Sequence, residues 1–184
     1  EETLDEELLA LYRGISAVLY PAGHIEEGEL INRRLFEHAR PTGDLPNMAA
    51  AVHGLQLAAF HGPRERRVAY REQARAALEA VAGRKLADAP SIRAAAFLGW
   101  LANQDYEACA KALGRARAIA AKSGNPVLER EVLAQWAVQA SHSARRRSAV
   151  ELWDAEARIS VDEPVFAGIE RHNDCAGFLL ALGR

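Results

Sequence analysis

Cysteine, methionine and lysine are scarce in this chain of 184 residues, which has two, one and three of them against 20 arginines and 38 alanines. The two cysteines, Cys109 and Cys175, are too few for a disulfide framework or a four-cysteine zinc site. A secretory signal peptide is not visible either. We therefore expect a reducing, cytoplasmic setting.

Long apolar runs and an excess of one charge are missing as well. No apolar run approaches the ~20 residues that a membrane-spanning helix requires. Acidic and basic residues nearly balance, at a formal net charge of -2, whereas nucleic-acid-binding modules usually have a strongly basic surface. We expect neither membrane association nor direct contact with nucleic acid.

The charge is nevertheless uneven along the chain. Residues 1–30 contain eight acidic residues and one arginine, so the remainder is net basic. The acidic residues near the start suit the positive end of a first helix dipole. Alternatively, they form an interface with a basic neighbouring domain.

Alanine dominates what is present. About a fifth of the residues are alanine, the best helix former, while β-branched residues are sparse. This composition predicts an all-α fold.

Four prolines divide the chain at intervals of ~40 residues: Pro46, Pro90, Pro126 and Pro164. Proline is tolerated in the first turn of a helix, where its missing N–H has no helical partner to lose. Capping or turn residues precede the four prolines, namely Asp44, Asp88, Asn125 and Asp162. A helix is therefore predicted to begin at each proline.

Between these positions, apolar residues recur at spacings of three and four, which places them on one helix face. Such stripes include Leu8, Leu11 and Ile15 near the start and Val132, Trp136 and Ala140 later. The pattern predicts four helical hairpins, at about 3–44, 45–84, 90–124 and 126–160, and a further helix at 164–182.

Hairpins of this length stack into a solenoid, because one hairpin alone cannot bury its apolar faces. We expect a single repeat domain over residues 1–184, folded as an α-α superhelix. Because the last helix would lack a hairpin partner, we also expect the chain to be part of a longer array.

Small and aromatic residues indicate the type of repeat. Leu98 and Gly99, followed by Tyr106 and by alanines along the next helix, resemble the pattern of tetratricopeptide repeats. Trp100 and Trp136 lie 36 residues apart on successive first helices. These positions favour a tetratricopeptide-like superhelix over the alternative, a HEAT-like array.

Motifs for metal, nucleotide or nucleophilic chemistry do not occur. His172 and Cys175 share a helix face, but a tetrahedral zinc site needs two further ligands. Neither GxxxxGK[ST] nor GxGxxG is present. We expect a protein that is not an enzyme, with no metal and no cofactor.

Two short basic clusters occur, at residues 64–67 and 145–147. Both fall at the start of the second helix of a hairpin and lack the interleaved aromatic residues of a base-stacking surface. We interpret them as solvated helix ends that pair with acidic neighbours.

The concave surface of a solenoid is lined by the first helix of each hairpin. Helical phase places amide, guanidinium, imidazole and indole groups there, which suit a peptide backbone or a polar small molecule. The candidate groove residues are His53, Gln56, Arg93, Trp100, Asn103, Arg130, Gln135 and Gln139.

Several short sequence segments resemble the helical-repeat regions of large bacterial transcription regulators. They are residues 39–44, residues 49–54, Gly62 and Pro63 before an arginine-rich helix, and residues 112–118. From about Ala22 to Ala157 the chain is similar to the maltose-activator-like LuxR family and to the antibiotic-regulatory activators. The resemblance implies repeats that bind an inducer or a regulatory partner and control self-association, while separate domains bind ATP and DNA.

These observations together predict a non-enzymatic sensor or interaction region of a cytoplasmic bacterial regulator. Its expected partner is a protein, a peptide or a small-molecule inducer, and a homodimer is one expected state. The alternative is a stand-alone tetratricopeptide adaptor that binds a client peptide. The two differ in whether nucleotide-binding and DNA-binding domains flank the region in the full gene.

Overall fold

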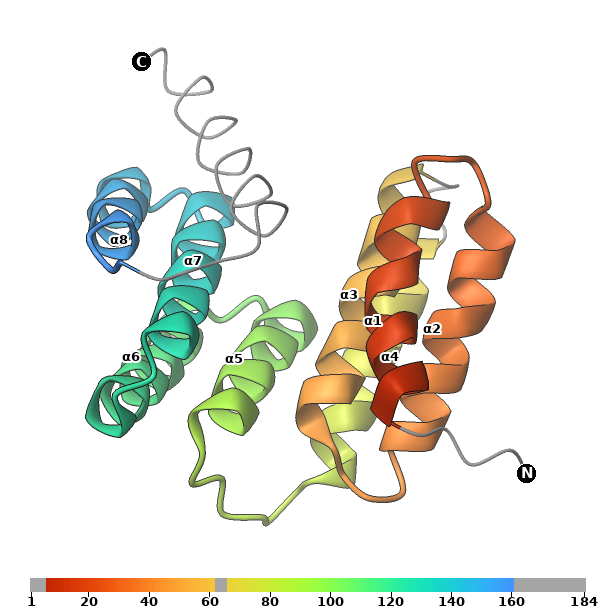
Figure 1. Ribbon diagram of the computed structural model, residues 1–184, viewed down its shortest axis with the longest axis horizontal. Helices are drawn as coiled ribbons and strands as arrows, with labels where there is room; N and C mark the ends of the chain where they lie inside the picture. The colour runs from red at the N-terminus through yellow and green to blue at the C-terminus, as the bar shows by residue number, and fades with distance from the viewer. Residues whose placement is uncertain (1–5, 62–65, 161–184) are drawn as a thin grey trace. The chain divides into compact units, whose positions relative to one another are not determined.

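A computed structural model describes residues 6–61 and 66–160. Its secondary structure consists of α-helices with no strand in these two ranges (Figure 1). The helices are α1 (Glu6–Leu19), α2 (Ile25–Ala39), α3 (Leu45–His61), α4 (Arg66–Ala80), α5 (Ala89–Asn103), α6 (Tyr106–Ser123), α7 (Pro126–His142) and α8 (Arg146–Ala157). The predicted all-α class is confirmed. The helix predicted at 164–182 lies outside the described residues.

The chain separates into two compact units. Of the described residues, the first comprises 6–61, 66–87 and 94–104, and the second comprises 88–93 and 105–160. Helix α5 is thus divided between the units.

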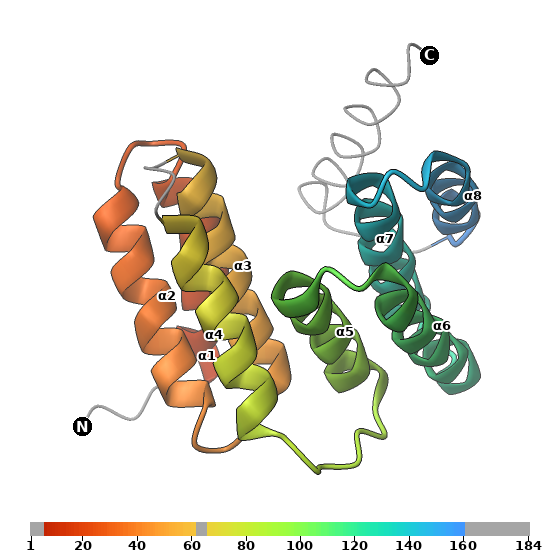
Figure 2. The ribbon, with the colours of Figure 1, turned by 180° about the vertical axis from the view of Figure 1, so that it is seen from behind.

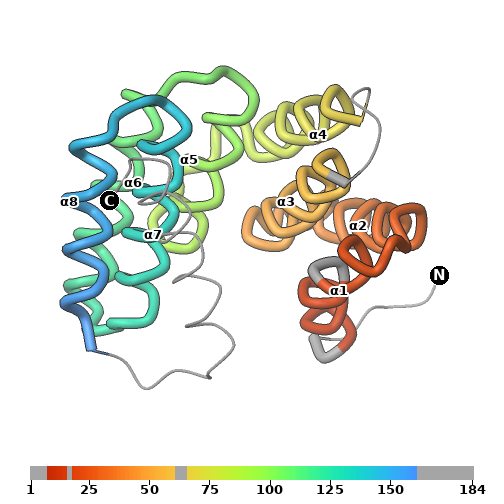
Figure 3. Tube along the Cα trace, turned by 90° about the horizontal axis from the view of Figure 1, so that it is seen from above, coloured from red at the N-terminus to blue at the C-terminus, as the bar shows by residue number. Residues whose placement is uncertain are grey.

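In the first unit, α3 contacts α1, α2 and α4 (Figure 3). Its buried side chains include Met48, Val52 and Leu55 at three- and four-residue spacing, as the sequence predicts. Gly54 allows α2 to approach closely, because a Cβ at this position would overlap the Asn32 carboxamide.

In the second unit, α7 packs against both α6 and α8 (Figure 2). The buried positions again follow helical periodicity, with Leu113, Ala116 and Ala120 on α6 and Val132 and Ala140 among those on α7. The abundant alanine side chains therefore form much of the interior here.

The predicted helix junctions are confirmed at the 44–46 and 124–126 turns. The Asp44 carboxylate accepts a hydrogen bond of 3.1 Å from the Asn47 N–H at the start of α3. Gly124 ends α6 in the left-handed conformation at φ 67°. Asn125 then caps α7 by accepting a hydrogen bond of 3.1 Å from the Leu128 N–H.

The predicted apolar stripe of α1 needs a correction. Leu11 is 55% exposed, while Leu9 is buried at 7%. Leu11 therefore does not belong to the core, whereas Leu8 and Ile15 of the same predicted stripe are half-buried, so the buried face of α1 is displaced toward Leu9.

Candidate functional site

Four of the eight candidate groove residues belong to the first unit. His53 on α3 is exposed, and its ring meets the edge of Phe97 at 6.0 Å between centroids. Gln56 is half-buried and Asn103 is exposed. Trp100, in contrast, is only 7% exposed and lies within the core.

The other four belong to the second unit, and two of them form ion pairs. Arg93 lies 2.8 Å from a Glu131 oxygen. Arg130 holds Glu156 through a 2.7 Å ion pair in which both side chains are largely buried. Gln135 is half-buried and Gln139 is buried. The arginines are therefore engaged by carboxylates of their own unit.

Three polar atoms on α7 and α8 are buried without a hydrogen-bond partner in the described part of the chain. They are Nε1 of Trp136, Oε1 of Gln139 and Nε1 of Trp153. The Gln139 and Trp153 residues are 3% and 6% exposed. Buried polar groups in native proteins are nearly always paired, with protein groups or with an ordered water.

The three atoms come from two neighbouring helices of the second unit. Trp136 and Gln139 are three residues apart on α7 and share a face. The Arg130–Glu156 ion pair sets the register of the two helices. One turn from Glu156 toward the connecting loop is Trp153, which therefore lies within about one helical turn of the level of Trp136. The Trp136 ring itself is directed toward α6, because its Cη2 lies 3.4 Å from the position of a Cβ at Gly114.

Helical phase predicts Gln139 as a groove residue, but it does not predict the indole groups beside it. The sequence pattern predicts that Trp136 and Trp153 are core residues, since tryptophan at helical spacing is usually buried. The sequence feature that could have indicated these groups is the occurrence of Trp136 and Trp153 on consecutive helices, because each buried indole N–H needs an acceptor.

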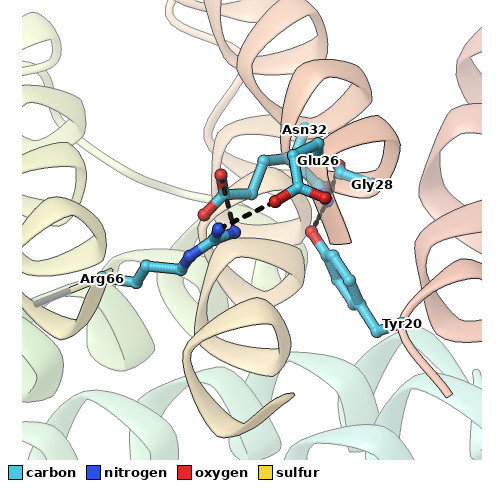
Figure 4. Close-up of polar contacts among 6 residues, drawn as sticks. Tyr20, Glu26, Gly28, Asn32 and Arg66 are labelled. Atoms are coloured by element: carbon cyan, nitrogen blue, oxygen red, sulfur yellow. Dashed lines mark hydrogen bonds and ion pairs between the residues drawn. The ribbon is translucent and has the colours of Figure 1, made fainter. Parts of the chain in front are cut away.

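A second polar cluster lies in the first unit (Figure 4). Asn32 is 1% exposed, and its Nδ2 donates hydrogen bonds of 2.8 Å to the Tyr20 hydroxyl and of 2.8 Å to the Gly28 carbonyl. Burial raises the pKa of Tyr20 from 10.0 to about 12. The phenol therefore stays protonated at neutral pH.

Arg66 closes this cluster at the start of α4. Its Nη1 lies 3.0 Å from an oxygen of Glu29, and its Nη2 lies 3.2 Å from an oxygen of Glu26. Arg66 Nη1 is buried and makes no hydrogen bond within the described residues, so its contact with Glu29 is an ion pair alone. We interpret the cluster as a clamp that fixes the starts of α2 and α4.

The prediction that the basic clusters pair with acids is confirmed in part, because no ion pair involves Arg67 or Arg146 within the described residues. Arg145 lies 2.7 Å from Glu107 and above the Tyr106 ring, at 5.5 Å from the ring centroid. Arg147 pairs with Glu151 at 3.0 Å. Residues 64 and 65 of the first cluster lie outside the described range.

The other candidate nucleophile and metal ligands of the sequence are a buried thiol and two residues outside the described range. Burial raises the pKa of the Cys109 thiol from 9.0 to about 12, so almost no thiolate forms at neutral pH. His172 and Cys175 are not among the described residues. Across residues 6–61 and 66–160, no three His, Cys, Asp or Glu side chains are grouped as a metal site requires. None of the helices there has the length and hydropathy of a membrane-spanning segment.

Comparisons with protein-family models, with curated proteins and with solved structures found no significant match to this chain.

Proposed function

We propose that this chain is a non-enzymatic helical-repeat region of a cytoplasmic bacterial transcription regulator, where it binds a ligand or a protein partner. In this proposal its hairpins belong to a tetratricopeptide-like superhelix. The observation that supports binding most directly is the group of three unpaired polar atoms of Trp136, Gln139 and Trp153.

An unpaired buried polar atom costs the folded protein about 1–3 kcal/mol. Three of them within one hairpin are therefore expensive if they have only a structural role. A bound molecule that supplies the missing partners removes this cost, which is a source of affinity and of selectivity.

The identities of the atoms define the chemistry of that molecule. Two indole N–H groups require hydrogen-bond acceptors, and the Gln139 oxygen requires a donor. A peptide backbone carries both carbonyl acceptors and N–H donors, so it offers both kinds of group that this set requires. A partner without a donor leaves the Gln139 oxygen unpaired.

The Gln139→Leu variant tests this proposal, because leucine occupies a similar volume without polar atoms. Without ligand, we expect the variant to unfold at higher urea, with about 1 kcal/mol more stability. The melting temperature of the wild type is expected to rise in millimolar amounts of end-blocked tripeptides, and that of the variant is not.

Gln135→Leu is the matched control on the same helix, since Gln135 is half-buried and none of its atoms is among the buried unpaired ones. We expect it to retain the peptide response. A Gln139→Leu variant that is less stable than the wild type would show that the Gln139 amide is already satisfied and would remove the support for this site.

The regulator context has a separate test in the full-length gene. We expect it to encode a nucleotide-binding domain and a helix-turn-helix domain around this region. If neither is encoded, the region is a stand-alone adaptor.

A further inference from the structure

The outer surface of α4 contains a row of three arginines, Arg67, Arg71 and Arg75. All three are exposed, while Tyr70, Ala74 and Ala77 form the buried face of the same helix. A spacing of four residues places the Cα atoms of successive arginines ~6 Å apart along the helix axis.

These arginines differ from Arg66, which immediately precedes them and forms two ion pairs. In the described part of the chain, no hydrogen bond or ion pair engages Arg67, Arg71 or Arg75. Their charge is therefore available to a binding partner.

Two apolar side chains are exposed near one end of this row. Val68 on the first turn of α4 is 58% exposed, and Phe60 near the end of α3 is 65% exposed. Because α3 and α4 are consecutive helices that pack on each other, both residues lie at the end of the hairpin where the two helices are joined.

This mixture favours a protein partner over a nucleic acid. Arginine and aromatic residues are enriched at protein–protein interfaces. Phosphate binding, in contrast, is driven by a concentration of positive charge, and α4 also exposes Glu72 and Glu79. A phosphate backbone would also leave Phe60 and Val68 uncovered.

We propose that this surface, made of Arg67, Arg71 and Arg75 with Val68 and Phe60, binds an acidic amphipathic helix of a partner protein. Carboxylates four residues apart on that helix match the ~6 Å spacing of the arginines. An apolar side chain at one end of the acidic row covers Val68 and Phe60. The surface is on the first unit and does not use Gln139, so it goes beyond the function proposed above.

The test uses a synthetic, end-blocked helical peptide of about 20 residues with glutamate at three successive fourth positions and leucine at both flanks of that row. Its affinity is measured by fluorescence anisotropy. We expect Arg71→Glu to weaken binding about tenfold or more, because it removes an attraction and adds a repulsion. We expect the wild-type affinity to fall as salt is raised.

Arg33→Glu is the matched control, since Arg33 is exposed on α2 and outside the row. It has the same change in charge, so we expect less than about a twofold effect on affinity. Circular dichroism of each variant verifies that it is folded. The Gln139→Leu variant is expected to bind the peptide as the wild type does, so a failure at the α7–α8 site leaves this result unaffected.

Three outcomes would overturn the proposal. The first is no measurable binding of the peptide by the folded wild type. The second is equal weakening by Arg71→Glu and Arg33→Glu, which would reflect net charge alone. The third is tighter binding to duplex DNA than to the peptide with loss in Arg71→Glu, which would assign the row to nucleic acid.

Discussion

Asn32 and Gly54 show how single residues determine the packing of the first unit. The Asn32 carboxamide is buried between α2 and α3, and its hydrogen bonds to Tyr20 and Gly28 depend on its position. Gly54 leaves the space that this carboxamide occupies. A small residue on one helix thus permits a polar residue on the next.

Gly54→Ala is expected to destabilise the protein by about 1–3 kcal/mol, since overpacking displaces Asn32 from its hydrogen bonds. This loss outweighs the ~1 kcal/mol by which alanine improves helix propensity. Urea unfolding measures the difference.

Gly99→Ala provides the control, because Gly99 is inside α5 and no atom lies within 4 Å of the added Cβ. There we expect a gain of up to ~1 kcal/mol from propensity alone. A loss of stability in Gly54→Ala together with a gain in Gly99→Ala would support the packing argument, whereas a stabilising Gly54→Ala would refute it.

Helix ends explain how the elements are delimited. Four glycines in turns, Gly23, Gly43, Gly83 and Gly124, have positive φ angles, which glycine adopts without steric cost. Ala144 has a φ of 57° in the turn between α7 and α8. The Arg145 N–H nevertheless donates a 2.8 Å hydrogen bond to the Ala140 carbonyl there. An L-residue thus occupies a conformation that favours glycine.

Ala144→Gly is expected to stabilise the protein by about 1 kcal/mol, because it relieves the left-handed strain of an L-residue. Gly124→Ala, at the equivalent position after α6, is expected to lower stability by a similar amount. Thermal unfolding of both variants tests the pair. A loss of stability in Ala144→Gly would show that the entropy of the unfolded glycine outweighs the strain.

In each compact unit, burial raises the pKa of one described side chain that stays protonated at neutral pH. These side chains are Tyr20 in the first unit and Cys109 in the second. Burial raises the pKa of both groups to about 12 from 10.0 and 9.0, respectively. The folded units thus retain protons that the unfolded chain releases at lower pH.

Stability is therefore expected to fall as pH rises from about 9 to 12, since the folded state binds more protons than the unfolded state in this range. Below pH 9 the contribution of both groups is fully present. Tyr20→Phe and Cys109→Ala should each reduce this alkaline loss, in the first and the second unit respectively. Urea unfolding at pH 8 and pH 11 gives the comparison, and unchanged pH dependence in both variants would contradict it.

The helices themselves could be predicted from the sequence because their signals are local. Pro126 after Asn125 and Gly124 specifies the end of α6 and the start of α7 through hydrogen bonds within a few residues. Alanine content and the spacing of apolar residues then determine the all-α class and most of the buried faces.

Only the tertiary structure decided which polar side chains have partners. Arg66 and Glu26 are 40 residues apart, and Arg130 and Glu156 are 26 residues apart, so no local pattern joins them. The same holds for the buried Trp100 and Gln139, and for Arg67, Arg71 and Arg75, which form no ion pair within the described residues. Pairing depends on which helix faces meet in space, and helical periodicity gives the faces without their neighbours.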